Sequence, residues 1–267
     1  MALAGRVPRQ DGPPRAGQSL QAAYSQRYSA WISARRRAAA LSALWWGPAI
    51  VAVSIIAGVS THFPFFGLVY LVLATAAVFD VLFRRPDALV RVKSRAHAES
   101  ETGKLLHAVE IRGKATVLND RMFTRTGNPF EIEHLVISPR GAFLIDSKQW
   151  HGRAVRIFGK DMYVDHVDRG PMLVQMVANA RALGEALTAA AGHDEEVGIV
   201  TVQPVLAVHS DALSGTPRNM QGVTVVIPTQ LAQMVRSPDV RWSPHAVDSL
   251  VKAADQLLVN KGTAGVA

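Results

Sequence analysis

The feature that most constrains the fold is a run of 42 residues, at positions 38–79, that contains no Asp, Glu, Lys or Arg. A single helix of that length would extend for about 63 Å, twice the hydrocarbon core of a bilayer at roughly 30 Å. The run must therefore reverse direction, and the sequence STHFP at positions 60–64 supplies polar residues and a proline near its middle. We expect a hairpin of two membrane-spanning helices, at about 41–59 and 64–83.

Arginines flank this predicted hairpin at both ends. Three precede the first span, at positions 35–37, and two follow the second, at 84 and 85, whereas the connecting loop has neither Lys nor Arg. Because positively charged flanks stay in the cytoplasm, the pattern predicts a multi-pass protein of the cell (inner) membrane. Both termini would be cytoplasmic and residues 38–85 would lie in the bilayer. The alternative is a helical hairpin buried in the core of a soluble protein.

The net charge of +8 is concentrated near the N-terminus. Residues 1–44 hold seven Arg and one Asp, whereas residues 84–267 hold 22 basic and 19 acidic residues. The C-terminal part therefore lacks the strongly basic composition of many nucleic-acid-binding surfaces. We expect residues 1–37 to form a basic, largely disordered tail, unstructured over the first 20 and an interfacial helix over 21–37. The chain has no Cys, which excludes disulfides and thiolate metal sites.

Residues 86–260 alternate between helical and strand patterns, and residues 261–267 are expected to be a disordered tail. The apolar spacing predicts helices at 87–110, 171–191, 229–236 and 243–259, hairpins within 130–150 and 153–167, and strands at 114–120, 197–210 and 222–228. Thr229 and Ser243 are the expected N-caps of the last two helices. This order of elements predicts an α/β (α+β) domain with a mixed central sheet, preceded by the two-helix transmembrane hairpin.

The hairpin FEIEHLVISPRGAFLIDSKQW, at positions 130–150, carries an unusual number of charges for an apolar segment. Its residues 142–145 are apolar on both faces, which indicates a central strand. Asp146 and Lys148 follow directly and share one face of that strand. Unpaired charges are costly at the end of a buried strand, so they indicate either a structural ion pair or a metal site.

The connection of this hairpin decides which residue faces Asp146. If Pro139 and Arg140 form a two-residue turn, Glu133 lies directly across from Asp146. If a three-residue bulged loop ends at Gly141 instead, the register shifts by one and Glu133 faces away from Asp146. A metal site therefore requires the two-residue turn or a compensating bulge.

A family resemblance rests on this hairpin and on the helices around it. The stretch EIEHLVISPRGAFLIDSKQWHGRAV resembles the core of the NERD (nuclease-related domain) family of restriction-endonuclease-like PD-(D/E)xK nucleases. That core has an acid before an apolar strand, a Gly-containing turn, a second apolar strand and then acid-x-Lys. HAESETGKLL resembles the preceding family helix, with Glu99 at its acidic position. PMLVQMVANARAL resembles the following helix, with Gln175 at its Gln position, and the resemblance covers roughly residues 90–260.

The resemblance implies a restriction-endonuclease-like fold and a metal-dependent phosphodiesterase site that acts on DNA or RNA. Glu133 and Asp146 would bind Mg²⁺ (or Mn²⁺), and Glu99 would be an additional ligand. Lys148 would orient the attacking water or the phosphate. Gln175 would be a supporting polar contact.

Two positions depart from the family pattern, since Glu133 replaces the usual Asp and Ala98 replaces the usual Gly. Two functions therefore remain open: a membrane-anchored, cytoplasm-facing nuclease, or a catalytically eroded nuclease fold that acts as a membrane-linked binding or scaffolding module. His134 alternates to the face opposite Glu133, and we expect it to be structural. Glu131 lies further from the acid-x-Lys pair, and we expect a solvated carboxylate at the sheet edge.

Overall fold

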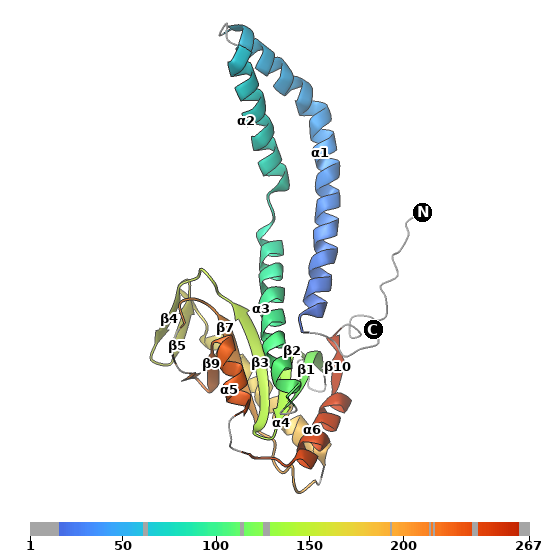
Figure 1. The fold of residues 1–267 in the computed structure, drawn as a ribbon, viewed down its shortest axis with the longest axis vertical. Helices are drawn as coiled ribbons and strands as arrows, with labels where there is room; N and C mark the ends of the chain where they lie inside the picture. The colour runs from blue at the N-terminus through green and yellow to red at the C-terminus, as the bar shows by residue number, and fades with distance from the viewer. Residues whose placement is uncertain are drawn as a thin grey trace, which may run out of the picture. The chain divides into compact units, whose positions relative to one another are not determined.

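The computed structural model describes residues 16–60, 64–112, 115–124, 129–192, 194–213, 215, 217–236 and 240–261 (Figure 1). These residues form two compact units. One unit joins the residues up to Leu20 with those from Ser94 onward, and the other comprises Gln21–Lys93. The N-terminal end of the first long helix therefore belongs to the same unit as the C-terminal domain.

Helices α1 (Gln18–Ser60) and α2 (Pro64–Phe83) run side by side in opposite directions (Figure 1). The helices Gln18–Ser60 and Phe65–Phe83 have the length and composition needed to cross a membrane. The predicted interfacial segment at 21–37 is continuous with the first span in one helix. Disorder was expected up to residue 20, but Gln18–Leu20 are helical, while residues 1–15 and the predicted turn at 61–63 lie outside the described residues.

The two helices approach closely through small residues and expose large apolar ones. A Cβ atom at Gly67 of α2 would lie only 2.4 Å from the Ser54 carbonyl oxygen of α1. Such contacts between small residues are typical of helix pairs in membranes. Leu44, Trp45 and Val81 are 71%, 78% and 71% exposed. Most of the window in each helix that is apolar enough to cross a membrane is exposed, so the two helices remain candidate spans.

The C-terminal domain contains helix α3 (Asp87–Glu110) and is built on a mixed sheet, as the sequence predicted. Its seven strands lie in the order β10 (Leu258–Asn260), β1 (Thr116–Phe123), β2 (Phe130–Ser138), β3 (Gly141–Gln149), β7 (Val202–His209), β9 (Val223–Val226) and β8 (Arg218–Met220). Strands β1, β2 and β3 are antiparallel neighbours, whereas β3–β7 and β7–β9 are parallel pairs. A smaller sheet contains β4 (Val155–Phe158), β5 (Asp161–Val164) and β6 (Val167–Asp168).

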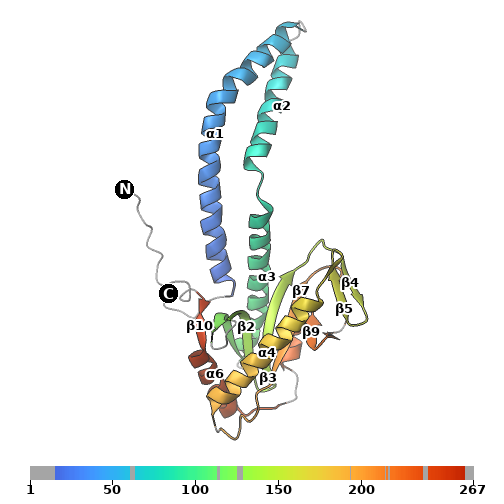
Figure 2. The ribbon, with the colours of Figure 1, turned by 180° about the vertical axis from the view of Figure 1, so that it is seen from behind.

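Helices cover both faces of the larger sheet, so β3 is buried on both sides. On one face, Leu183 of α4 (Gly170–Ala191) and Leu250 of α6 (Pro244–Leu257) pack against Leu135 and Leu144 (Figure 2). On the other face, residues of α3 and α5 (Leu231–Arg236) pack against Phe143 and its neighbours. This burial explains the apolar run at 142–145 and places β3 at the centre of the domain.

Most predicted elements are present, and the differences lie at the ends of the sheet. The helix at 87–110 was predicted with the observed bounds, but the strand expected at 197–210 begins only at Val202. Strands β8 and β10 were not predicted. Thr229 lies within a short 3₁₀ turn (Pro228–Gln230) rather than at the N-cap of α5. Of the tail expected at 261–267, Lys261 is described and pairs with Glu131, and residues 262–267 lie outside the described residues.

Ser243 is the N-cap of α6, as predicted, and its Oγ accepts a hydrogen bond from the Ala246 N–H at 3.2 Å. We expect Ser243→Ala to lower the free energy of unfolding by about 1 kcal/mol, because this N–H loses its acceptor. Thermal denaturation of the full-length chain in detergent measures the effect. Ser249→Ala, in the same helix but away from its end, is the control and should not lower Tm. Equal destabilisation by both substitutions would contradict a capping role.

Candidate active site

The register of the β2–β3 hairpin brings Glu133 and Asp146 to the same place. Ser138 pairs with Gly141, and His134 pairs with Ile145. The connection is therefore the two-residue turn, as the metal-site hypothesis required. One step further along the ladder, Glu133 lies across from Asp146. The regular backbone pairing of β2 and β3 ends here. Beyond it, Oε2 of Glu133 accepts a hydrogen bond from the Ser147 N–H at 2.7 Å.

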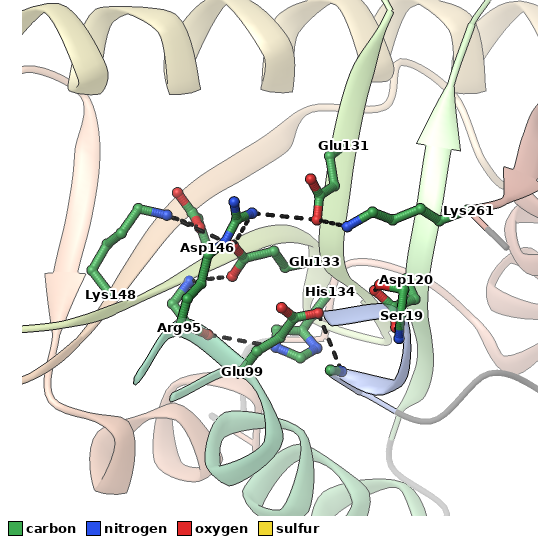
Figure 3. A network of polar contacts seen from close by, with 12 residues as sticks. Ser19, Arg95, Glu99, Asp120, Glu131, Glu133, His134, Asp146, Lys148 and Lys261 are labelled. Atoms are coloured by element: carbon green, nitrogen blue, oxygen red, sulfur yellow. Dashed lines mark hydrogen bonds and ion pairs between the residues drawn. The ribbon is translucent and has the colours of Figure 1, made fainter. Parts of the chain in front are cut away.

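Four charged side chains meet at this end of β3 (Figure 3). Lys148 forms an ion pair with Asp146, and its Nζ lies 3.7 Å from Oε1 of Glu133. Arg95 of α3 donates to the same Oε1 of Glu133 at 3.0 Å. The side chain of Glu133 is only 4% exposed, whereas those of Asp146 and Lys148 are each 25% exposed. Asp146 and Lys148 are therefore partly exposed to solvent, whereas the neighbouring Glu133 is buried.

Burial and mutual repulsion shift the ionisation of this group. Burial, and then the charge of Glu133, raise the pKa of the Asp146 carboxyl to about 7, although Lys148 opposes the shift. Burial disfavours the charged form of Lys148, but the attraction of Asp146 and Glu133 outweighs it and raises the pKa of the ammonium. An added cation would stabilise the ionised form of Asp146 beside Glu133.

Glu99 extends from α3 into the same region and is fully buried. Its Oε1 accepts from the Gly17 N–H at 3.2 Å, while its Oε2 is buried with no hydrogen-bond partner among the described residues. Burial, followed by the charges of Glu133 and Asp120, raises the pKa of Glu99 to about 9. A buried carboxyl oxygen normally contacts a hydrogen-bond donor or a cation, and Oε2 of Glu99 has no such contact among the described residues.

Glu99, Asp120 and Glu131 each offer one oxygen, and these three atoms lie within 4.8 Å of one another. Asp120 was missed by sequence reasoning, which treated it as the end of a strand, although β1 continues to Phe123. Its backbone is left-handed, with φ of 52°, in the middle of that strand. Adjacent Asn and Asp are unfavourable inside a strand, and this was the available signal for an irregular backbone.

Glu131 is not the solvated edge carboxylate that the sequence predicted. Its side chain is 26% exposed, and Arg95 donates to its Oε1 at 3.3 Å. Lys261, at the end of β10, forms an ion pair with the same oxygen. Lys261 and Arg95 therefore tie Glu131 into the network around Glu133. The labelled residues in Figure 3 include five acidic side chains and three cationic ones, so the acids outnumber the cations that could pair with them.

His134 lies apart from the carboxylates and has structural contacts, as expected. Its Nδ1 shares a hydrogen bond with Oδ1 of Asn119 at 2.8 Å, and the ring is fully buried. Burial lowers the pKa of His134 to about 4, so the ring is neutral near pH 7. Its other nitrogen lies 3.5 Å from the Ser147 hydroxyl. The ring thus supports the backbone of Ser147, which in turn holds Glu133.

Gln175 lies on the exposed face of α4. Its Nε2 donates to Oδ1 of Asn179, one helical turn further on, at 2.8 Å. The contacts described for Gln175 do not connect it to the carboxylates. The structure therefore brings Glu99, Glu133, Asp146 and Lys148 into one network and leaves Gln175 on a neighbouring surface.

Comparison with known proteins identifies the region that contains this network. The family model for NERD, described as "Nuclease-related domain", matches residues 94–209. The matched range begins within α3 and ends with β7, so it contains Glu99, Glu133, Asp146 and Lys148. No curated protein and no solved structure matches the chain.

Proposed function

We propose that this chain hydrolyses phosphodiester bonds of nucleic acid, with a divalent cation held by its carboxylates, because residues 94–209 match the nuclease-related domain (NERD) family model. The observation that carries the proposal is the convergence of Glu133, Asp146 and Lys148 at the end of β3. This is the acid-plus-lysine set that such chemistry requires.

The residues present fit a hard divalent cation. Mg²⁺ and Mn²⁺ take oxygen ligands, and Glu133 and Asp146 supply carboxylates that repel each other when the cation is absent. Glu99 adds a buried oxygen without a hydrogen-bond partner among the described residues. A bound cation supplies a water molecule of lowered pKa and a counter-charge for the phosphate. Glu133, Asp146 and Glu99 would hold it.

The protein's own groups have distinct tasks around that cation. The Ser147 N–H fixes the longer Glu133 side chain at 2.7 Å, which compensates for the extra methylene relative to Asp. Lys148, exposed at one side, holds a phosphate oxygen or orients the attacking water. Gln175 contributes a polar contact to the nucleic acid from α4.

The helical hairpin supports a location for this activity. Two helices suited to crossing a membrane precede the domain. We propose that residues 38–85 anchor the chain in the cell (inner) membrane, with both termini in the cytoplasm. The arginines at 35–37 and 84–85 favour this orientation. The domain would then meet cytoplasmic DNA or RNA.

A cleavage assay tests the proposal. Full-length chain in detergent, freed of metal with EDTA, is incubated with plasmid DNA or a long single-stranded RNA. We expect cleavage only after Mg²⁺ or Mn²⁺ is added, and we expect EDTA to abolish it. Cleavage that persists in EDTA, or its absence with both nucleic acids and both ions, would contradict the proposed activity.

One observation favours the second function, a binding or scaffolding module. Arg95 and Lys148 already pair with Glu133 and Asp146, so the site is partly neutralised without a cation. In that case the charged network would be structural, and the fold would be retained for assembly at the membrane. Calorimetric titration with Mn²⁺ separates the two functions, since a folded chain that gives no heat of binding supports the scaffold.

A further inference from the structure

We propose that Glu99, Asp120 and Glu131 form a second divalent-cation site, distinct from the Glu133–Asp146 pair. The inference deepens the proposed metal-dependent function, because Glu99 is shared between the two sets. It rests on carboxylates that the acid-x-Lys pattern does not include. The expected ligand is a hard divalent cation such as Mg²⁺, Mn²⁺ or Ca²⁺.

The first observation is the spacing of the three carboxylates. One oxygen from each lies within 4.8 Å of the other two. Glu99 is 0% exposed and Asp120 is 2% exposed, so water does not screen their charges. Buried like charges at this separation repel strongly unless a proton or a cation lies between them.

The second observation is the unpartnered oxygen of Glu99. Its Oε2 is buried and accepts no hydrogen bond from the described residues. Figure 3 shows the Glu99 carboxylate in the region between Asp120 and Glu133. A buried polar atom without a partner costs about 1–3 kcal/mol. A cation bound at this oxygen removes that cost.

The third observation is the uneven supply of positive charge. Lys261 and Arg95 both pair with Glu131. Glu99 and Asp120, in contrast, receive neutral donors: the Gly17 N–H contacts Glu99, and the Ser19 N–H and hydroxyl contact Asp120. Among the described residues, no Lys or Arg forms an ion pair with Glu99 or Asp120. The two most deeply buried carboxylates of the set are thus the ones without a counter-ion.

The backbone of Asp120 gives independent support. Its φ of 52° is rare for a non-glycine residue in the middle of a strand. Strained conformations of this kind persist where the surroundings fix them, and they concentrate at functional sites. Here the Ser19 N–H and hydroxyl hold both oxygens of Asp120, at 3.1 and 2.9 Å. The strain keeps the carboxylate beside Glu99 rather than on an ordinary strand face.

Counting bound Mn²⁺ tests the second site without reference to cleavage. Metal-free full-length chain in detergent is titrated with Mn²⁺, and free ion is measured by electron paramagnetic resonance. We expect about two ions per chain for the wild type and about one for Asp120→Asn. Asp255→Asn is the matched control, because Asp255 is 52% exposed and pairs with Arg121 elsewhere on β1. It should bind about two ions.

Two further variants separate this inference from the proposed function. Glu131→Gln serves if Asp120→Asn does not fold, since Glu131 is partly exposed, and it should also bind about one ion. Suppose that Asp146→Asn leaves the number of bound Mn²⁺ ions unchanged while Asp120→Asn lowers it. This result would support the second site and contradict metal binding by the Glu133–Asp146 pair. A wild-type count that neither Asp120→Asn nor Glu131→Gln reduces, in folded protein, would overturn the second site.

Discussion

Replacing Asp146 with Asn is expected to lower the rate of Mg²⁺-dependent cleavage by at least about a hundredfold. The side chain keeps its size, but it loses the charge that faces both Lys148 and the proposed cation. Because Asp146 is 25% exposed and not part of the apolar core, the fold should tolerate the change. Single-turnover cleavage, at saturating Mg²⁺ and with circular dichroism as a check of folding, measures the effect.

Lys148→Ala gives this prediction a second signature. It should also reduce the cleavage rate, since the ammonium near the phosphate is lost. The affinity for Mn²⁺ should stay the same or rise, since the substitution removes a cation that competes for the carboxylates. Arg181→Ala on α4 is the control, as Arg181 is 81% exposed and pairs only with Glu185 among the described residues. It should cleave at the wild-type rate. Wild-type cleavage by Asp146→Asn would exclude this carboxylate from the reaction.

Replacing Glu99 with Gln is expected to stabilise the metal-free protein. The Gln side chain retains the oxygen that accepts from Gly17 and replaces the unpartnered Oε2 with an N–H₂ group facing Asp120. It also removes the cost of keeping Glu99 protonated in the folded state at pH 8, where burial and the charges of Glu133 and Asp120 hold its pKa at about 9. We expect a gain of about 1–3 kcal/mol in the free energy of unfolding at pH 8 in EDTA.

The gain should depend on pH in a defined direction. The pKa of Glu99 is raised from 4.5 to about 9, so the folded state keeps a proton that the unfolded chain has already released. Stability contributed by this carboxyl is present below about pH 4.5 and is lost as the pH rises towards 9. The advantage of Glu99→Gln should therefore be small at pH 5 and large at pH 8.

Thermal denaturation in EDTA at the two pH values measures this difference. Glu101→Gln is the matched control: it lies on the same helix and pairs with Lys104 at the surface. Its Tm should stay close to that of the wild type at both pH values. Addition of Mn²⁺ should raise the Tm of the wild type more than that of Glu99→Gln. A lower Tm for Glu99→Gln than for the wild type at pH 8 in EDTA would contradict the prediction. It would mean that the Glu99 carboxyl has favourable contacts in the metal-free protein.

The part of the site that the sequence predicted is the part made by local contacts. The turn at Pro139 and Arg140 fixes the pairing of β2 and β3, and this pairing alone brings Glu133 to Asp146. Helix α3 could be predicted because its composition is read within the segment itself. Both inferences needed only neighbours in the sequence.

The missed part depends on contacts between distant segments. Asp120 receives its hydrogen bonds from Ser19, which lies 101 positions earlier. Glu131 pairs with Lys261, which lies 130 positions later. No periodicity or motif marks Glu131. At Asp120 the adjacent Asn119 signals an irregular backbone, but the residue that holds its carboxylate, Ser19, lies far away in the sequence.

The two-residue turn between β2 and β3 also affects the order in which contacts of the site form while the chain is being synthesised. A hairpin closed by so short a connection has a small loop-closure cost, so Glu133 and Asp146 can meet as soon as β3 has left the ribosome. The parallel partner β7 and the lysine at position 261 emerge only later. The nascent domain therefore carries Glu131 beside this acidic pair before Lys261, the cation that pairs with Glu131, has been synthesised.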